Sequence, residues 1–148
     1  MFKLYSKGCQ YAIFALTDVC IREKGERFQA KDVCERLNIP EFFTRKIFQA
    51  LVQGGFLLAH RGPGGGYSLS RPPSEISILE VIHAVEGEDT FGHCIMGFPE
   101  CNAKVPCSLH HLWASAKQSL VSKLGESTLQ DVTDARLRRE RAQRTKTE

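Results

Sequence analysis

A run of glycine and proline between two short β-type segments restricts the fold of this chain more than any other feature. Residues 61–66 read Arg-Gly-Pro-Gly-Gly-Gly, and glycine clustered with proline ends regular structure and favours a turn. The apolar segment 56–60 precedes this turn, and residues 67–70 alternate apolar and polar side chains after it, as short strands do. The sequence therefore predicts a two-stranded β-hairpin with a glycine-rich tip.

Three segments with apolar residues at helical spacing precede the hairpin. They cover residues 6–24, 30–37 and about 40–53. Ser6 is a suitable cap for the first helix, and Pro40 suits the first turn of the third helix after the short break at 38–40. Two helices joined by a short turn form a helix-turn-helix, and the hairpin behind them is then its wing.

The second half of the chain is expected to contain one short helix and one long helix. Ser77 and Glu80 form a capping box that opens a short helix ending near Val85. Residues 86–105 read as irregular, and a long final helix is expected from about Pro106. Its apolar stripe consists of Leu109, Leu112, Trp113, Ala116, Leu120, Val121 and Leu124. Because this stripe is long for a small domain, we favour a dimer interface over an ordinary core contact.

These elements predict a mainly α-helical fold, a winged helix-turn-helix with a two-stranded β wing and a long C-terminal dimerisation helix. The expected parts are a winged DNA-binding domain at 1–85, a cysteine-bearing loop at 86–108, a dimerisation helix with a return segment at 106–135, and a tail at 136–148. The tail holds six Arg or Lys against two Glu. Charge runs of this kind are usually solvated, and we expect the tail to be disordered.

Composition places the chain among ordinary globular proteins. Its 148 residues suffice for one domain with its own core. No apolar run approaches the roughly 20 residues of a membrane helix, and the N-terminal residues carry no signal-peptide pattern. We therefore expect a cytoplasmic protein without a membrane partner.

The six cysteines fall into two groups. Cys9, Cys20 and Cys34 lie in the helical segments and are expected to be packed thiols. Cys94, Cys101 and Cys107 lie together in the irregular segment, with His110 three residues further on. In a reducing compartment such a group is more typical of a metal site than of disulfides. Three thiolates and one imidazole suit either zinc or an iron–sulfur cluster, and the spacing alone leaves both open.

Four segments together resemble the Rrf2 family of bacterial transcription regulators. They are residues 3–12, residues 39–51, the wing at 61–67, and the cysteine group followed by Leu112-Trp113. The resemblance implies a regulator, not an enzyme, that binds a double-stranded DNA operator as a homodimer. It also implies an iron–sulfur cluster that senses redox state, nitric oxide or iron–sulfur status. A 2Fe–2S cluster is favoured, and a 4Fe–4S cluster is the alternative.

Candidate DNA contacts follow from the third helix and the wing. Thr44, Arg45, Lys46 and Gln49 fall away from the expected inward face at Phe43, Ile47 and Leu51. Arg, Lys and Gln side chains reach base edges or phosphates. Arg61 resembles the family's minor-groove arginine, and Lys7 is a candidate phosphate contact.

The candidate cluster ligands are Cys94, Cys101, Cys107 and His110. His93 and His111 are rival ligands for the fourth position. Some family members take a carboxylate from the first helix instead. The matching residue here is Gln10, a poor ligand, which leaves its neighbour Cys9 as an outside candidate.

Three other functions stay open from the residues alone. A zinc-stabilised DNA-binding module uses the same four side chains without sensing. A regulator without a cofactor responds through thiol chemistry. A cysteine enzyme uses Cys107 and His110 as nucleophile and base, but helix neighbours rarely supply the third, orienting group.

Overall fold

The computed structural model describes residues 4–22 and 25–146. Within these ranges the chain is mostly helical and has one two-stranded antiparallel sheet, which confirms the predicted fold class. The elements in chain order are α1 (Lys7–Cys20), α2 (Ala30–Leu37), α3 (Glu41–Gln53), β1 (Leu57–His60), β2 (Gly66–Leu69), a 3₁₀ turn (Pro73–Glu75), α4 (Ile78–Glu86), α5 (His110–Glu126) and α6 (Leu129–Arg144).

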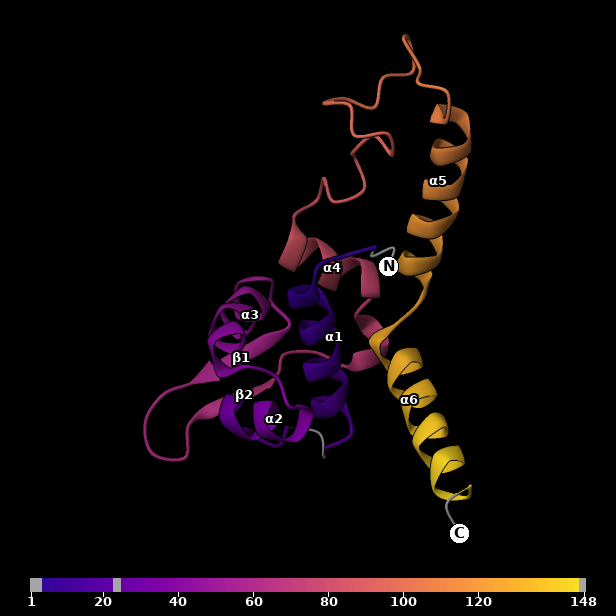
Figure 1. The fold of residues 1–148 in the computed structure, drawn as a ribbon. Helices are drawn as coiled ribbons and strands as arrows, with labels where there is room; N and C mark the ends of the chain where they lie inside the picture. The colour runs from indigo at the N-terminus through magenta and orange to yellow at the C-terminus, as the bar shows by residue number, and fades with distance from the viewer. Residues whose placement is uncertain (1–3, 23–24, 147–148) are drawn as a thin grey trace.

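Helix α1 lies at the centre of the fold and packs against α2, α3, α4 and α6 (Figure 1). The Ser6 side chain caps it by accepting from the backbone N–H of Cys9, as expected. The helix ends at Cys20, earlier than the predicted 24, and a bond from Arg22 N to Val19 O follows its last turn. Residues 23 and 24 lie outside the described ranges.

The helix-turn-helix forms where the sequence predicts it. Helix α2 ends at Asn38, whose φ of 51° is left-handed, a conformation that asparagine tolerates better than most residues. Pro40 then caps α3 rather than starting its first turn. The inner sides of α2 and α3 bury Val33, Phe48 and Leu51 in the common core.

The wing is a β-hairpin in which Leu57 pairs with Leu69 and His60 with Gly66. Phe28 extends it on the other edge, because its N–H and C=O both bond to the backbone of Tyr67. This pairing requires Gly66: its φ is +123°, and an added Cβ would lie 2.5 Å from the Phe28 oxygen. The wing is thereby joined directly to the segment that precedes α2.

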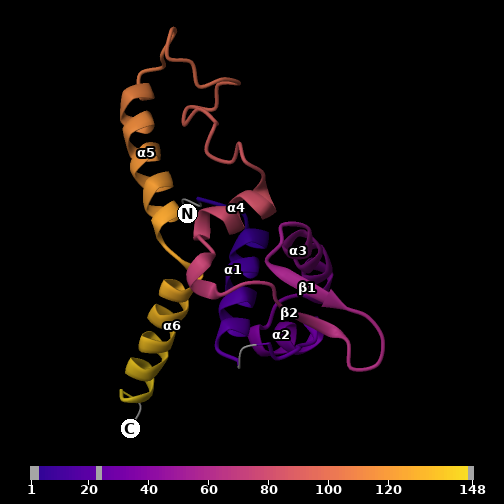
Figure 2. The ribbon, with the colours of Figure 1, turned by 180° about the vertical axis from the view of Figure 1, so that it is seen from behind.

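Helix α4 begins at the predicted capping box, in which Ser77 and Glu80 bond to each other's backbone N–H groups. Residues 87–109 are irregular, and α5 begins at His110 rather than near Pro106. In Figures 1 and 2, this loop lies at one end of α5, and α5 and α6 run along the side of the molecule opposite the wing. Across residues 4–22 and 25–146, no helix is both long enough and apolar enough to span a membrane.

The prediction of a disordered tail from residue 136 is wrong, because α6 continues to Arg144. The helix starts at a second capping box, formed by Thr128 and Asp131. It buries Leu129 and Thr133 in the domain, so its first turns are held by packing as well as by their own bonds.

Arg136 attaches the next turn of α6 to α1. Its guanidinium donates to Thr17 Oγ1 at 3.1 Å, lies 4.0 Å from Asp18, and pairs with Glu140 one turn ahead at 2.9 Å. The count of like charges missed these partners, because Asp18 lies 118 residues away in sequence. Residues 147 and 148 of the predicted tail lie outside the described ranges.

Candidate DNA-binding face and cysteine cluster

The outer surface of α3 carries one stripe of exposed side chains. Phe42, Arg45, Lys46 and Gln49 are all exposed, and their spacing of three, four and seven residues places them on one helix face. Arg45 pairs loosely with Glu41 at 3.8 Å, and an exposed pair of this kind contributes little to stability. This pair therefore does not prevent the Arg45 guanidinium from contacting a partner.

Thr44 does not belong to this stripe, although the sequence analysis placed it among the DNA contacts. Its side chain is 3% exposed. The Thr44 hydroxyl accepts a bond from Cys34 Sγ at 2.7 Å and donates to Pro40 O at 3.3 Å. Thr44 therefore joins α2 to α3 and is too deeply buried to reach a base.

Phe43 shows the opposite difference, since it was expected to face inward and is 44% exposed. Its ring packs edge-on against Tyr11, with centroids 6.0 Å apart. Lys7 lies over the same tyrosine, with Nζ 5.9 Å from the ring centroid. This contact brings Lys7 beside the start of α3, where a phosphate contact would need it.

Phe42 is the member of the stripe that the sequence analysis missed. Phe42 lies three residues before Arg45 and four before Lys46, and this helical spacing would have placed it on the same face as the two basic residues.

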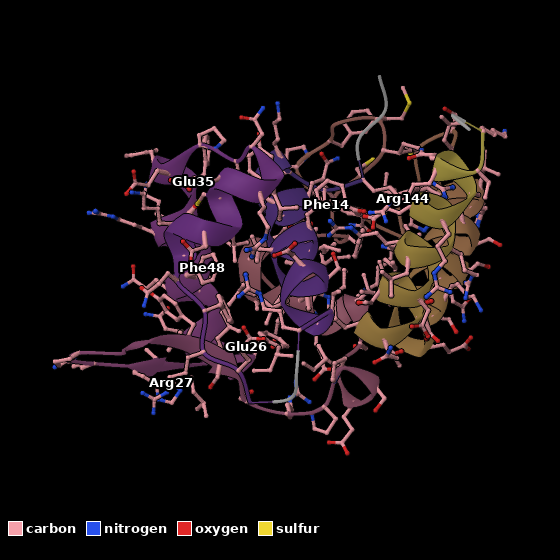
Figure 3. All side chains as sticks on the ribbon, turned by 90° about the horizontal axis from the view of Figure 1, so that it is seen from below. Phe14, Glu26, Arg27, Glu35, Phe48 and Arg144 are labelled. Atoms are coloured by element: carbon pink, nitrogen blue, oxygen red, sulfur yellow. The ribbon has the colours of Figure 1, made fainter. Side chains whose placement is uncertain are left out.

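The wing tip exposes Arg61 together with most of the glycine turn. Two side chains from the segment before α2 hold the turn: Arg27 donates to Gly64 O at 3.1 Å, and Gln29 donates to Gly65 O at 2.8 Å. Figure 3 shows Arg27 alongside the hairpin. The backbone at the tip is thus fixed from outside the hairpin, and Arg61 is exposed.

Three of the four predicted cluster ligands, Cys94, Cys107 and His110, line one pocket of about 470 Å³, and Cys101 lies against His110. Cys94 Sγ lies 3.7 Å from Cys107 Sγ, and Cys101 Sγ lies 3.5 Å from His110 Nδ1. Two sulfur ligands of one tetrahedral metal, with bonds of about 2.3 Å, lie about 3.8 Å apart, and a sulfur and a nitrogen lie slightly closer. Both separations fit two ligands that share one metal.

The four side chains come as two pairs. Among the described residues, no three His, Cys, Asp or Glu side chains surround a single metal position. One pair consists of Cys94 and Cys107, and the other of Cys101 and His110. This division suits a centre in which two metal ions each take two protein ligands.

Backbone N–H groups stabilise the Cys94 thiolate. The N–H groups of Met96, Phe98 and Gly97, together with the Cys107 thiol, donate toward its sulfur and lower the pKa of Cys94, Met96 having the largest effect. A thiolate is the form that binds metals. The turn after Cys94 therefore prepares this sulfur as a ligand.

Both ends of the loop are anchored. Phe91 is buried in the core of the winged domain, and Trp113 Nε1 on α5 donates to His93 O at 2.9 Å. His93 is thus tied through its backbone, and its side chain is exposed. His111 is also exposed, whereas His110 is buried, so the structure brings His110 rather than its two rivals to the cysteines.

The other three cysteines lie in or against the helical core. Cys9 and Cys34 are buried, and Cys20 is half-buried. Burial raises the pKa of Cys9 to about 12 and that of Cys20 to about 11. Cys9 and Cys20 therefore stay protonated at neutral pH, and none of the three thiols lines the pocket of the other cysteines.

Comparisons with known proteins agree with this architecture. Residues 5–135 match the Rrf2 family, described as iron-dependent transcriptional regulators. A putative HTH-type transcriptional regulator of Haemophilus influenzae is 34% identical over 90% of this chain and 88% of that protein. The HTH-type transcriptional regulator IscR of Xenorhabdus nematophila is 32% identical over 88% of this chain and 78% of that protein.

Solved structures show the same fold. CymR, the global cysteine regulator of B. subtilis, superposes with a TM-score of 0.76 at 20% identity, covering 91% of this chain and 98% of CymR. IscR of T. potens superposes with a TM-score of 0.71 at 24% identity, covering 90% of this chain and 88% of that protein.

The fold, the exposed helix face and these relatives define a winged-helix transcriptional regulator. The chain belongs to the Rrf2 family, and it resembles IscR within that family.

Proposed function

We propose that this chain is a cytoplasmic, homodimeric DNA-binding regulator whose signal is read by an iron–sulfur cluster, most directly 2Fe–2S, at Cys94, Cys101, Cys107 and His110. The observation that carries the proposal is the pairing of Cys94 with Cys107 and of Cys101 with His110 around the start of α5, where Cys94, Cys107 and His110 line one pocket. A bound cluster supplies redox and nitric-oxide chemistry, and the described residues supply its ligands and its position.

The two ligand pairs support a binuclear centre over a single zinc ion. In a 2Fe–2S centre each iron takes two protein ligands, and histidine replaces cysteine in some of these centres. A zinc ion instead takes four ligands around one position. A 2Fe–2S cluster held by three thiolates and one neutral imidazole should have a higher reduction potential than one held by four thiolates.

DNA binding is assigned to the stripe of Arg45, Lys46 and Gln49 on α3, to Arg61 at the wing tip and to Lys7. In this arrangement α3 enters the major groove, where Arg, Lys and Gln side chains read base edges. Arg61 lies at the neighbouring minor groove, whose negative potential attracts arginine. Lys7 contacts a phosphate, which positions the protein without reading sequence.

The position of the loop connects the two functions. Residues 87–109 join α4 of the winged domain to α5, the helix that we assign to the dimer interface. Loss of the cluster, or a change in its charge, reorders the loop and changes how the two winged domains are spaced. The affinity for an operator with fixed half-site spacing then changes.

The test of the cluster is anaerobic purification followed by an absorption spectrum and counts of iron and acid-labile sulfide. The proposal expects a coloured protein with about two iron and two sulfide per chain. A colourless protein with about one zinc per chain supports the zinc-stabilised module instead. A protein without metal whose DNA affinity depends on oxidation supports the thiol regulator.

Variants assign the ligands. Cys94→Ser, Cys101→Ser and Cys107→Ser should each lose the visible spectrum. Cys20→Ala and Cys34→Ala are matched controls, because these thiols lie outside the pocket, and they should retain it.

The fourth ligand has its own pair of variants. His110→Ala should give a labile or spectrally changed cluster, and His110→Cys should keep a cluster at a lower potential. His111→Ala is the neighbouring control. If only His111→Ala changes the spectrum, the ligand is His111; if neither variant does, Cys9 in α1 is the next residue to vary.

A further inference from the structure

An aromatic ring stands almost free in solvent at the start of α3. Phe42 is 72% exposed, more than any other aromatic side chain in the described residues. Its ring touches Phe43 edge-on, with centroids 5.9 Å apart, and Lys46 Nζ lies 5.3 Å from its centroid. The adjacent rings of Phe42 and Phe43 are both exposed, and an apolar patch rimmed by polar side chains indicates a contact surface.

The surroundings of the ring determine which partner suits it. Phe42 shares a shallow hollow of about 460 Å³ with Glu41, Arg45 and Lys46. The partner must therefore offer negative charge to the two cations and an apolar spot to the ring, within the span of one helix turn.

A second copy of this chain does not meet that requirement. In a two-fold symmetric contact the same patch meets itself, so two patches that each carry Arg45 and Lys46 against a single Glu41 would come together. Like charges brought together in this way oppose association.

The major groove of DNA does meet the requirement. Its walls carry phosphates, and each thymine presents a C5-methyl group, the apolar feature that distinguishes A·T pairs in that groove. Phenylalanine is among the side chains that make apolar contacts with this methyl group.

We propose that Phe42 reads a thymine methyl group in each half-site of the operator, beside the bases or phosphates contacted by Arg45 and Lys46. This inference rests on the proposed DNA-binding function and adds a base preference to it. The ring covers the methyl group and loses its own exposure to water, while the neighbouring cations hold the helix in the groove.

The experiment begins with the anaerobically purified full chain and a pool of random-sequence DNA duplexes. Wild-type protein and the variants Phe42→Ser, Phe42→Leu and Phe14→Ala each select their preferred duplexes. Phe14 is a matched control: it is a second exposed phenylalanine, at 52%, and it lies on α1 away from α3 and the wing (Figure 3). Wild type and Phe14→Ala should enrich thymine at one position of each half-site, and Phe42→Ser should lose that enrichment while keeping the rest of the site.

The second step replaces the enriched thymine by deoxyuridine, which removes only the methyl group. Wild-type affinity should fall about fourfold per half-site, as expected for one apolar carbon returned to water. Phe42→Ser should bind the two duplexes equally, and Phe42→Leu should retain part of the difference. Circular dichroism and sedimentation of each variant should match wild type, because the ring is not part of the core.

Two outcomes separate this inference from the function beneath it. The inference is overturned if the protein selects a defined site in which no thymine preference depends on Phe42. It is also overturned if wild-type protein binds the thymine and deoxyuridine duplexes equally. Either result leaves DNA binding in place. Failure of the wild-type protein to select any site overturns the proposed function itself.

Discussion

At the scale of single residues, Cys9, Cys20 and Cys94 differ in acidity for identifiable reasons. Burial raises the pKa of Cys9 and Cys20, whereas the N–H groups after Cys94 lower the pKa of its thiol. Thiolate reactivity is therefore concentrated in the loop, and the thiols of α1 are inert at neutral pH.

The raised pKa of Cys9 predicts a loss of stability at high pH. The unfolded thiol ionises near pH 9 and the folded one near 12, so above pH 9 the folded state holds the proton that the unfolded state has lost. The free energy of unfolding should then fall by up to about 1.4 kcal/mol per pH unit through this residue. Urea unfolding between pH 8 and 10.5 measures the slope. Cys9→Ala should show a shallower decline, and an identical slope in the variant would contradict this cause.

Gly66 is the glycine on which the wing most depends. Gly66→Ala forces a side chain into a left-handed conformation and against the Phe28 oxygen, and it should cost about 2 kcal/mol of stability. Gly64→Ala is the control, because Gly64 also has a positive φ but open space around it. Thermal unfolding should show the larger loss for Gly66→Ala, along with weaker DNA binding; equal losses would mean that the pairing with Phe28 is unimportant.

At the scale of the elements, α5 carries two kinds of apolar residue. Leu120, Val121 and Leu124 pack against the core of their own domain, whereas Leu112 is 68% exposed. The stripe predicted from sequence is thus divided between the domain core and a free surface. The free part, near the cysteine loop, is where we expect the dimer partner.

This division selects the variant that tests dimerisation. Leu112→Glu places a charge on the free part of α5 and should give folded monomers in sedimentation velocity at low micromolar concentration. Gln118→Glu introduces the same group at an exposed position on another side of α5 and should stay dimeric. A dimer that persists in Leu112→Glu would move the interface to another surface.

At the scale of the whole molecule, the basic side chains lie on two different sides of the protein. The net charge is only +3, so attraction to DNA depends on where the basic side chains lie. Lys7, Arg45, Lys46 and Arg61 belong to the proposed DNA face, whereas the arginines of α6 lie along the side opposite the wing (Figure 1).

Operator binding should therefore weaken steeply with salt, through the residues of one face. If a dimer neutralises six to ten phosphates, affinity should fall about 10³- to 10⁵-fold between 50 and 200 mM salt. Lys7→Ala should reduce the slope of log affinity against log salt by about one per protomer, and Arg139→Ala on α6 should leave it unchanged. A slope that responds equally to both variants would mean that α6 also contacts DNA.

The sequence alone determined the features that depend on local chemistry. Helix caps, the break before α3, the glycine turn of the wing and the grouping of three cysteines with His110 are set by residues close together in the chain. Their positions in the structure differ from the predicted ones by a few residues at most.

Only the tertiary structure decided which side of an element meets a partner. Thr44 and Phe43 exchanged their expected environments because α2 covers one side of α3 and the bond to Cys34 draws Thr44 inward. The basic tail became part of a helix whose first turns bury Leu129 and Thr133 in the domain and whose Arg136 meets Thr17 and Asp18 on α1. The spacing of residues within a segment determines which side chains share a helix face. Which of these faces is buried depends on contacts with residues far away in sequence, and these contacts form only in the folded chain.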